Sequence, residues 1–295
     1  MEKPHILATK PGEYKGIRQI FAPLLEKHFT VVPYHEFEKN PNLWAHKIQA
    51  VIVWFTIPKI SRDLLLSLPN LKAVISGGVG VDHLDIPLIT SFGVKIANTP
   101  NIVDNATADI GMALLLASAR KLIEGMGRIG HKIAKRAQGF DMKILYHNRK
   151  QREAEDEKAV GATYCAKIED LLRESDFVML SVNLSPETHK LIGKRELSLM
   201  KPTATLVNVS RGLVVDQDAL VEALEDGVIY AAALDVTYPE PLPRNHPLLR
   251  LKNVLILPHM GTASYQTTRA MVERIIANTH LALEGSPLLD EVKPN

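Results

Sequence analysis

Three side chains able to bind and protonate a small acid follow three predicted strands in the second half of the sequence. Arg211 follows the apolar run 204–209, Glu240 follows 230–236 and His259 follows 254–257. A guanidinium can grip a carboxylate with two hydrogen bonds, an imidazole can transfer a proton near neutral pH, and a nearby carboxylate favours the charged imidazole. Each one alone could be an ordinary surface residue. Because the carboxyl ends of parallel strands meet at one edge of a sheet, their shared position predicts one site.

A glycine-rich run from Gly125 to Gly130 has the spacing G-x-G-x-x-G. Such glycines allow a tight turn and let a pyrophosphate approach the N-terminus of the following helix. By itself the pattern could be a plain turn. A helical stripe at Ile129, Ile133 and Ala137 and an apolar run at 142–147 follow it, and these neighbours favour a dinucleotide site.

The residues after the next predicted strand bear on the choice of dinucleotide. About twenty residues beyond the glycines, an NAD-specific site places Asp or Glu on the ribose hydroxyls. This sequence has Asn148, Arg149 and Lys150 there. Two cations suit a 2′-phosphate that a carboxylate would repel, which predicts NADPH (NADP) as the preferred cofactor. NADH stays an alternative, and an exposed basic loop without a ligand is the plainer interpretation.

A second glycine-rich segment follows the apolar run 71–76, at Gly77, Gly78 and Gly80. Backbone amides exposed at the carboxyl end of a buried strand could hold a carboxylate. Glycines commonly follow strands, so a flexible turn without a ligand is the alternative.

The elements that must position these residues alternate between strand and helix. The expected strands are 5–8, 29–32, 50–54, 71–76 and 94–97, and then 142–147, 177–182, 204–209, 230–236 and 254–257. A helix is expected to begin near Asp104, and further helices at 129–137, 168–173, 218–225 and 262–283. Apolar runs without in/out alternation indicate parallel strands covered on both faces. The fold class is therefore α/β, with two doubly wound parallel-sheet domains.

Length and composition exclude several other classes of protein. The 295 residues are 46% hydrophobic and 23% charged, and 35 basic side chains balance 33 acidic ones. Because the charges nearly balance, the chain lacks the strong positive electrostatic field that would attract nucleic acid or an anionic membrane. The longest uncharged apolar segment, 110–119, is shorter than the roughly 18 residues of a membrane span. A single cysteine, Cys165, and no secretory signal pattern predict a cytoplasmic protein, and no metal ligands are expected.

Taken in order, six motifs resemble the D-isomer-specific 2-hydroxyacid dehydrogenase family, and within it the glyoxylate/hydroxypyruvate reductase and 2-ketogluconate reductase branch. The motifs span nearly the whole chain. They are 76–82 (SGGVGVD), 98–100 with 106–109 (NTP and ATAD), 125–130 (GMGRIG), 208–212 (NVSRG), 234–242 (LDVTYPEPL) and 258–263 (PHMGTA).

The resemblance implies the reduction of a small 2-oxo acid by hydride transfer, hydroxypyruvate to D-glycerate or glyoxylate to glycolate. It implies that Arg211 grips the substrate, that His259 donates the proton and that Glu240 supports His259. It also implies that the backbone at Val79 and Gly80 receives the substrate carboxylate. The residues expected to line the cofactor are Thr107, Gly125, Gly127, Arg128, Ile129, Gly130, Asn148, Arg149, Lys150, Asn183, Val209, Asp235 and Thr262.

Family likeness also implies the domain organisation. A flavodoxin-like substrate (catalytic) domain is expected over 1–100 plus 265–295, with the last helix returning to the N-terminal part. A Rossmann dinucleotide-binding domain is expected over 101–264.

The sequence departs from the family just before the glycine-rich run. Family members carry there an arm that wraps the partner subunit and then the first strand of the nucleotide-binding sheet, whereas Glu124 directly precedes Gly125 in this chain. The pattern indicates an internal deletion. Losing a central strand predicts a second domain that is unstable or repacked, with 113–119 as a substitute strand in place of helix.

Two other functions stay open at this point. One is 2-ketogluconate reduction, which needs a larger pocket near Val79 and Leu242. The other is a catalytically inactive deletion variant or an interaction protein resembling corepressors of this fold. A homodimer is expected from the family, although its wrapping arm would lie in the missing block.

Overall fold

The structure, a computed structural model, describes residues 3–13, 16–118 and 126–294. The chain divides into two compact units, Met1–Val103 with Ser264–Asn295, and Asp104–Ala263. These divisions fall close to the expected boundaries at 100 and 265. The expected roles of the two units in binding substrate and cofactor stay predictions.

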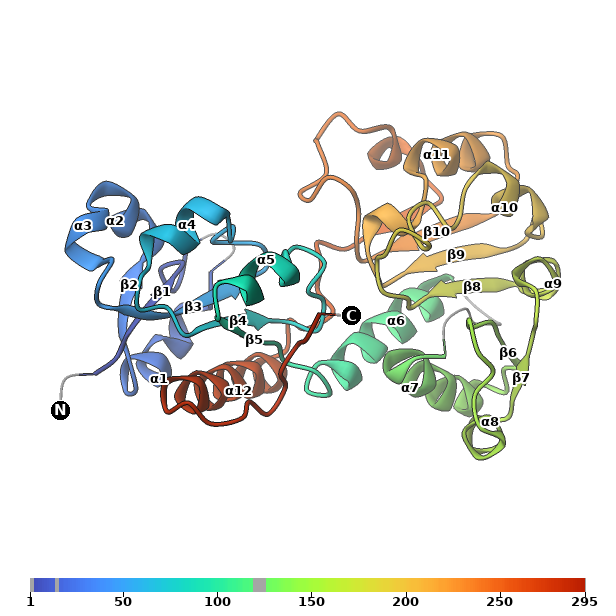
Figure 1. The fold of residues 1–295 in the computed structure, drawn as a ribbon. Helices are drawn as coiled ribbons and strands as arrows, with labels where there is room; N and C mark the ends of the chain where they lie inside the picture. Colours follow the sequence, from blue (N-terminus) through green and yellow to red (C-terminus); the bar gives the residue numbers. More distant parts are fainter. Residues whose placement is uncertain (1–2, 14–15, 119–125, 295) are drawn as a thin grey trace. The chain divides into compact units, whose positions relative to one another are not determined.

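The first unit is built on a five-stranded parallel sheet with the order β2-β1-β3-β4-β5 (Figure 1). Its strands are β1 (His5–Ala8), β2 (Thr30–Pro33), β3 (Ile48–Trp54), β4 (Ala73–Gly77) and β5 (Lys95–Ala97). Its helices are α1 (Ala22–Glu26), α2 (Tyr34–Lys39), α3 (Pro41–Trp44), α4 (Arg62–Ser67), α5 (Ile86–Ser91) and α12 (Tyr265–Leu283), with a 3₁₀ turn, η1, at Gln19–Phe21.

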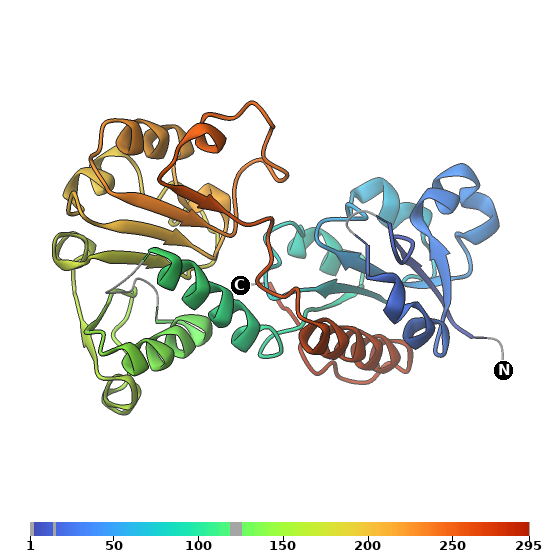
Figure 2. The ribbon, with the colours of Figure 1, turned by 180° about the vertical axis from the view of Figure 1, so that it is seen from behind.

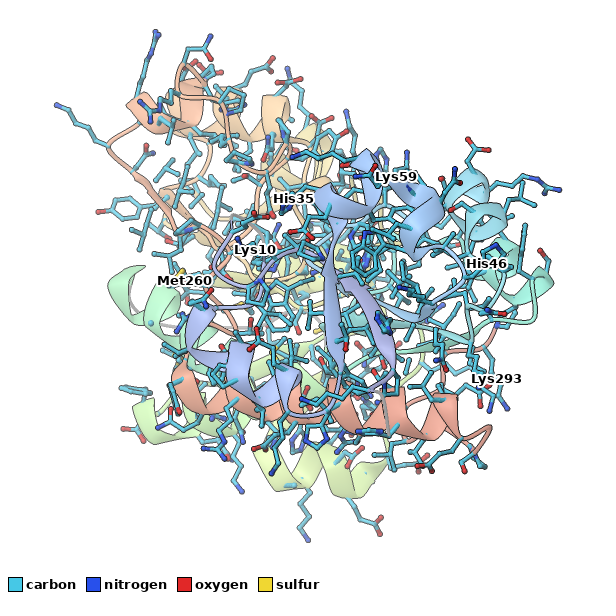
Figure 3. All side chains as sticks on the ribbon, turned by 90° about the vertical axis from the view of Figure 1, so that its left-hand side faces the viewer. Lys10, His35, His46, Lys59, Met260 and Lys293 are labelled. Atoms are coloured by element: carbon cyan, nitrogen blue, oxygen red, sulfur yellow. The ribbon has the colours of Figure 1, made fainter. Side chains whose placement is uncertain are left out.

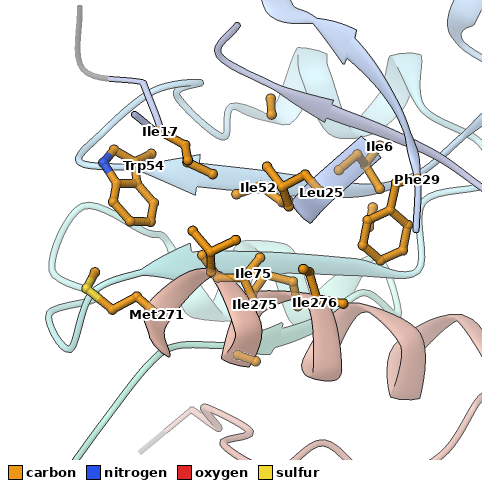
Figure 4. Close-up of a cluster of buried hydrophobic side chains, with 14 of the residues drawn as sticks. Ile6, Ile17, Leu25, Phe29, Ile52, Trp54, Ile75, Met271, Ile275 and Ile276 are labelled. Carbon is orange, nitrogen blue, oxygen red and sulfur yellow. The ribbon is translucent and has the colours of Figure 1, made fainter. Parts of the chain in front are cut away.

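Successive side chains of these strands enter two different cores, which explains why the runs are apolar throughout. Ile52 and Ile75 face α1 and α12, where they meet Leu25 and Ile275 (Figure 4). Their neighbours Val51 and Val74 face α2, α4 and α5 on the other side. Full burial of each such side chain contributes about 1.5–3 kcal/mol. The last helix therefore belongs to the first unit, as expected.

The second unit contains two parallel sheets. A four-stranded sheet has the order β11-β10-β9-β8, and a two-stranded sheet pairs β6 with β7. The strands are β6 (Ile144–Tyr146), β7 (Ala162–Tyr164), β8 (Phe177–Leu180), β9 (Thr205–Asn208), β10 (Ala231–Leu234) and β11 (Val254–Ile256). The helices are α6 (Asp104–Ser118), α7 (Arg128–Ala137), α8 (Ala154–Val160), α9 (Ile168–Glu174), α10 (Lys194–Leu199) and α11 (Gln217–Glu225), with 3₁₀ turns η2 (Gln138–Phe140), η3 (Gly212–Val214) and η4 (Pro247–Arg250).

Both sheets of the second unit share the same two cores. On one face α6 and α7 lie side by side (Figure 2). Below them, Ile133 packs with Tyr146 of β6 and Met179 of β8. On the other face α9, α10 and α11 cover Val178 of β8, and Leu145 of β6 belongs to the same cluster. The β6–β7 pair thus continues the layer of the larger sheet.

The layer is interrupted between β6 and β8. Within the described residues no strand pairs with both, and this is the place where the missing strand was expected. The suggestion that 113–119 forms a substitute strand is wrong for 113–118, because α6 runs to Ser118; residue 119 lies outside the described residues. Strand β7 and helices α8 and α10 were not predicted. No helix in the described parts of the chain is long and apolar enough to cross a membrane.

Candidate active site

The loops that leave β9, β10 and β11 bring the three predicted catalytic side chains to the carboxyl edge of the four-stranded sheet. Arg211 directly precedes η3, Glu240 lies six residues beyond the end of β10, and His259 follows β11. The register of the parallel ladders, Ala232 beside Leu206 and beside Val254, ends the three strands at one level. The shared strand-end position read from the sequence is therefore a real juxtaposition within one unit.

Glu240 and His259 are joined by a hydrogen bond. The Nδ1 atom of His259 lies 3.0 Å from Oε2 of Glu240, and the two side chains are 30% and 34% exposed. The other carboxylate oxygen, Oε1, accepts the backbone N–H of Thr237 at 3.0 Å. Because Nδ1 contacts the carboxylate, a proton exchanged with a ligand would pass through the other ring nitrogen, Nε2.

The electrostatics keep Glu240 ionised. Burial by itself raises the pKa of this carboxyl group, but the hydrogen bond and charge of His259 outweigh it, aided by the Thr237 amide and the charge of Arg211. The net pKa of Glu240 lies below its usual value. The Arg211 guanidinium is close enough to act on this carboxylate, so all three side chains form one electrostatic group.

A close backbone contact sets the distance between the Arg211 and Glu240 loops. A Cβ atom on Gly212 would lie 2.1 Å from the carbonyl carbon of Thr237 and 2.6 Å from the nitrogen of Tyr238. Only glycine permits this approach, because no side chain fits between the two loops. Gln217 adds a second tie: its Oε1 accepts the N–H of Tyr238 at 2.8 Å, and its Nε2 donates to the carbonyl oxygen of the same residue.

Asp235 holds the loop that carries His259. Its carboxylate accepts the N–H of Met260 at 2.6 Å and that of Gly261 at 2.9 Å, and its carbonyl oxygen accepts the N–H of His259 at 2.9 Å. His259 itself has a left-handed backbone with φ 55°, a strained conformation that needs such support. Burial raises the pKa of Asp235, which is 2% exposed, although the two amides oppose the change.

Asn208 orders the chain before Arg211. Its Oδ1 accepts both the N–H and the Oγ–H of Ser210, at 2.9 and 2.7 Å, and its Nδ2 donates to the carbonyl oxygen of Arg211 at 2.9 Å. The guanidinium of Arg211 donates to the carbonyl oxygen of Ser210 at 2.8 Å. Sequence reasoning missed this supporting role of Asn208, although the residue stands within the motif 208–212.

The residues around the start of α7 fit a pyrophosphate. Gly127 directly precedes the helix, and a Cβ added to it would meet only the Ser181 carbonyl oxygen, at 3.9 Å. Within the described residues no side chain caps the helix and no acidic residue lies in its first turn, an arrangement that suits an anion at its first N–H groups. Gly130 is buried within the helix. Gly125 lies outside the described residues.

The predicted selectivity loop lies next to this turn. Oδ1 of Asn148 accepts the N–H of Met126 at 3.0 Å, a contact not foreseen from the sequence. Arg149 and Lys150 are exposed. Hydrogen bonds from Ser185 and the backbone lower the pKa of Glu187, and the charge of Arg149 contributes a smaller part.

The other expected cofactor residues are distributed around the same edge. Thr107 of α6 meets Gly261, where an added Cβ would lie 3.4 Å from its Oγ1 and 3.2 Å from Asp235. Arg128 has its Nε 3.6 Å from the buried carboxylate of Asp104. Asn183 is exposed, and its carbonyl oxygen accepts the hydroxyl of Thr188. Val209 is buried, and Ile129 and Thr262 are half-buried.

Val79 and Gly80 belong to the first unit, in the loop that leaves β4. Both are half-buried. The carbonyl oxygen of Val79 accepts Nδ2 of Asn98 at 2.8 Å, and that of Gly78 accepts the N–H of Thr99 at 2.9 Å. The motif 98–100 therefore shapes this glycine loop. Their binding of a substrate carboxylate stays a prediction.

A cavity of about 380 Å³ in the first unit lies at the opposite ends of the strands. It is lined by His46, Gln49, Pro69, Asn70, Leu71 and Lys72, which precede or begin β3 and β4. His46 is exposed (Figure 3). Ligands of open parallel sheets bind at the carboxyl ends of the strands, so this cavity is not the expected site. Among the described residues, no cluster of three potential metal ligands was found.

The fold and the contacts of the second unit are those of an α/β protein whose glycine turn and following helix suit a dinucleotide. Residues 105–261 match the model of the NAD binding domain of D-isomer specific 2-hydroxyacid dehydrogenases. A glyoxylate reductase from Thermococcus litoralis is 36% identical over 331 residues, covering 99% of this chain and 96% of the relative. The chain belongs to the D-isomer specific 2-hydroxyacid dehydrogenase family, as the motifs indicated.

Solved structures agree with this assignment. An NADPH-dependent glyoxylate/hydroxypyruvate reductase from Sinorhizobium meliloti, in complex with NADP and malonate, matches with a TM-score of 0.86 and 28% identity over 99% of this chain and 97% of that one. A glyoxylate reductase from Paecilomyes thermophila matches with a TM-score of 0.83 and 29% identity, over 99% and 98%. Membership of this family supports an oxidoreductase that acts on 2-oxo acids.

The aligned length bears on the missing segment. The alignment with the Thermococcus litoralis enzyme spans 331 residues, more than the 295 of this chain, so the relative carries residues that this chain lacks. The interruption between β6 and β8 lies where the missing strand was expected, whereas the predicted deletion point, between Glu124 and Gly125, lies outside the described residues.

Proposed function

We propose that this chain reduces a small 2-oxo acid, hydroxypyruvate to D-glycerate and glyoxylate to glycolate, with NADPH as the preferred cofactor. The observation that carries the proposal is the 3.0 Å contact between Nδ1 of His259 and Glu240, with the charge of Arg211 acting on the same carboxylate. These are a proton donor, its supporting acid and an anion-binding group at one edge of one sheet.

Each of the three residues has a separate role in this proposal. Arg211 binds the substrate carboxylate through its guanidinium, and His259 gives a proton from Nε2 to the carbonyl oxygen. Glu240 orients the imidazole and stabilises its protonated form through Nδ1. A bound reduced nicotinamide supplies the hydride that the carbonyl carbon receives. Asp235 and Asn208 keep the loops of His259 and Arg211 in place.

The preference for NADPH rests on the loop after β6. Arg149 and Lys150 are exposed beside the start of α7, and neither Asp nor Glu stands at 147–150. Binding of NADP by the Sinorhizobium meliloti relative supports the same choice. We therefore assign the 2′-phosphate to Arg149 and Lys150, with NADH as the weaker cofactor.

The proposal has three further parts. They are the binding of the substrate carboxylate by Val79 and Gly80, a homodimer as the assembly, and a cytoplasmic location. The proposed partner is a small 2-oxo acid, and neither nucleic acid nor a membrane is proposed as a partner.

The proposal is tested by mixing the purified chain with NADPH and glyoxylate or hydroxypyruvate and following the absorbance of the reduced nicotinamide. His259→Asn should lower kcat by about 100-fold or more, since general acid catalysis contributes about that much, and should leave the Kd of NADPH unchanged. His46→Asn, at the cavity of the first unit, is the matched control. A folded parent chain that binds NADPH but has no turnover would refute the proposal, as would an active His259→Asn.

A second candidate function is that of a catalytically inactive relative that keeps the scaffold for other contacts. The interruption between β6 and β8 favours it, because a nucleotide-binding sheet depends on continuous packing across that position. Thermal melts with and without NADPH separate the two candidates, since a ligand that binds the native state raises Tm. Insertion of the corresponding segment of a relative should then restore activity.

A further inference from the structure

Beyond the residues expected to touch the cofactor, Arg152 lies where it can fix the glycine-rich turn. Its Nε donates to the carbonyl oxygen of Met126 at 2.8 Å. The N–H of the same Met126 donates to Oδ1 of Asn148 at 3.0 Å. Both backbone groups of Met126, directly before Gly127, are therefore held by side chains of one loop.

That loop is itself anchored at both ends. The N–H of Arg152 donates to the hydroxyl oxygen of Tyr146 at 2.8 Å, and this hydroxyl donates to Glu157 at 2.6 Å. At the other end, the hydroxyl of Tyr164 donates to the carbonyl oxygen of Asn148 at 3.1 Å. Tyr146 is fully buried, so the anchor at the Arg152 end is fixed in the core.

The anchored segment spans the two exposed cations proposed to select NADPH. Arg149 and Lys150 lie between Asn148 and Arg152, whose side chains both bind Met126. The turn for the pyrophosphate and the loop for the 2′-phosphate are thus joined as one rigid piece. The pyrophosphate that NADPH and NADH share needs this turn in one conformation, and rigid positioning of the turn lowers the entropy cost of binding either dinucleotide.

We propose that Arg152 is a positioning residue for the dinucleotide, acting through its Nε–H bond to Met126 and not through its charge. This inference rests on the proposed placement of the cofactor at the start of α7. It assigns to Arg152 a function that differs from direct recognition of the 2′-phosphate by Arg149.

Three substitutions of Arg152 separate the hydrogen bond from the charge. Arg152→Gln keeps an N–H group at the ε position without a charge. Arg152→Lys keeps the charge and moves the donor by one bond. Arg152→Met keeps an unbranched side chain that reaches the ε position but removes both the hydrogen-bond donor and the charge. Arg173→Met, at an exposed arginine paired only loosely with Asp170 at 3.6 Å, is the matched control.

The readout is the Kd measured by calorimetry for NADPH, for NADH and for adenosine 2′,5′-bisphosphate, together with kcat and Tm. Arg152→Met should weaken NADPH and NADH alike, by about fivefold to tenfold, the equivalent of one hydrogen bond. Arg152→Gln should bind both within about twofold of the parent, with kcat and Tm unchanged. This ranking, with Gln above Met, supports the proposal.

Any other ranking overturns it. If Arg152→Lys retains affinity while Arg152→Gln is as weak as Arg152→Met, the charge matters and the positioning role is wrong. Unchanged binding by Arg152→Met also refutes it. If Arg152→Met does not fold, the comparison of the Gln and Lys variants decides. Arg149→Met tests the proposed cofactor preference separately: equal weakening of NADPH and NADH there refutes that preference and leaves the Arg152 result standing.

Discussion

Gly212→Ala should disable the active site without touching any residue that contacts substrate. The added methyl carbon would lie 2.1 Å from the carbonyl carbon of Thr237 and 2.2 Å from its oxygen. Carbon atoms in contact pack at about 3.5–4.0 Å, so one loop must move by about 1.4 Å or more. Both neighbours in this contact are backbone, and no flexible side chain can give way.

The movement reaches Glu240 because that side chain is tied to the same loop. Its Oε1 accepts the N–H of Thr237 at 3.0 Å, while its Oε2 meets His259 at 3.0 Å. Misplacement of a reacting group by about 1 Å lowers rates by about 100-fold. Overpacking of this kind also lowers the free energy of unfolding by about 1–3 kcal/mol.

The assay compares kcat for glyoxylate reduction and Tm of the parent, Gly212→Ala and Gly139→Ala. The last is the matched control, because an added Cβ on Gly139 has no neighbour within 4 Å. We expect kcat to fall by about 100-fold and Tm by about 3–10 °C in Gly212→Ala. A kcat within about twofold of the parent would refute the close contact as the feature that sets the site geometry.

Three further perturbations test the supporting contacts. Asp235→Asn should lower kcat by about tenfold or more, because one of the two buried amides of the His259 loop loses its acceptor. An unchanged kcat would contradict the role of Asp235 in supporting this loop. Tyr146→Phe removes the hydroxyl bonded to Arg152 and Glu157 and should lower the free energy of unfolding in denaturant melts by about 1–3 kcal/mol. In the first unit, burial and then the charges of His280 and nearby lysines lower the pKa of His28 in the folded chain. Protonation of His28 therefore favours the unfolded chain. The free energy of unfolding is highest above about pH 6.5, the pKa of an unfolded histidine, and decreases as the pH falls through the lower pKa of the folded chain. Tm should fall less in His28→Asn than in the parent between about pH 7.5 and pH 5, and equal losses would oppose this reasoning.

Short buried strands were predictable because their sequence carries the signal for burial. The run 5–8 was predicted with the bounds that β1 has, and the runs at β9, β10 and β11 placed Arg211, Glu240 and His259 at one sheet edge. Parallel strands covered by helices are apolar at every position, so local sequence is enough to find them.

Strand β7 was missed for the opposite reason. Ala162–Tyr164 is partly exposed along its length and contains a threonine in its centre. Its pairing with β6 depends on tertiary contacts, including the bond from the Tyr164 hydroxyl to the Asn148 carbonyl oxygen. No apolar run marks such an edge strand.

The contacts that support the site could not be predicted from the sequence either. Asn148 was assigned to the cofactor from its position, yet its Oδ1 binds the backbone of Met126, 22 residues earlier. Gly212 was recognised within a motif, but its contact with Thr237 depends on how two loops approach in space. Residue types predict which chemistry is available, whereas these long-range contacts determine its geometry.

The most direct measurement of the central claim is the pH dependence of kcat/KM for reduction in the parent and in Glu240→Gln. A glutamine amide can still accept the Nδ1–H of His259, so the substitution removes mainly the charge. Two unit charges about 4 Å apart interact by about 1 kcal/mol in water and about 4 kcal/mol at an effective dielectric constant near 20. Partial exposure places this pair toward the lower figure.

We predict that the basic limb of the profile lies at lower pH in Glu240→Gln than in the parent, because the imidazole loses its anionic partner. Such a shift would mean that the protonated imidazole, stabilised by this carboxylate, is the proton donor. A profile that keeps its basic limb in place, with the rate lowered equally at every pH, would contradict the account.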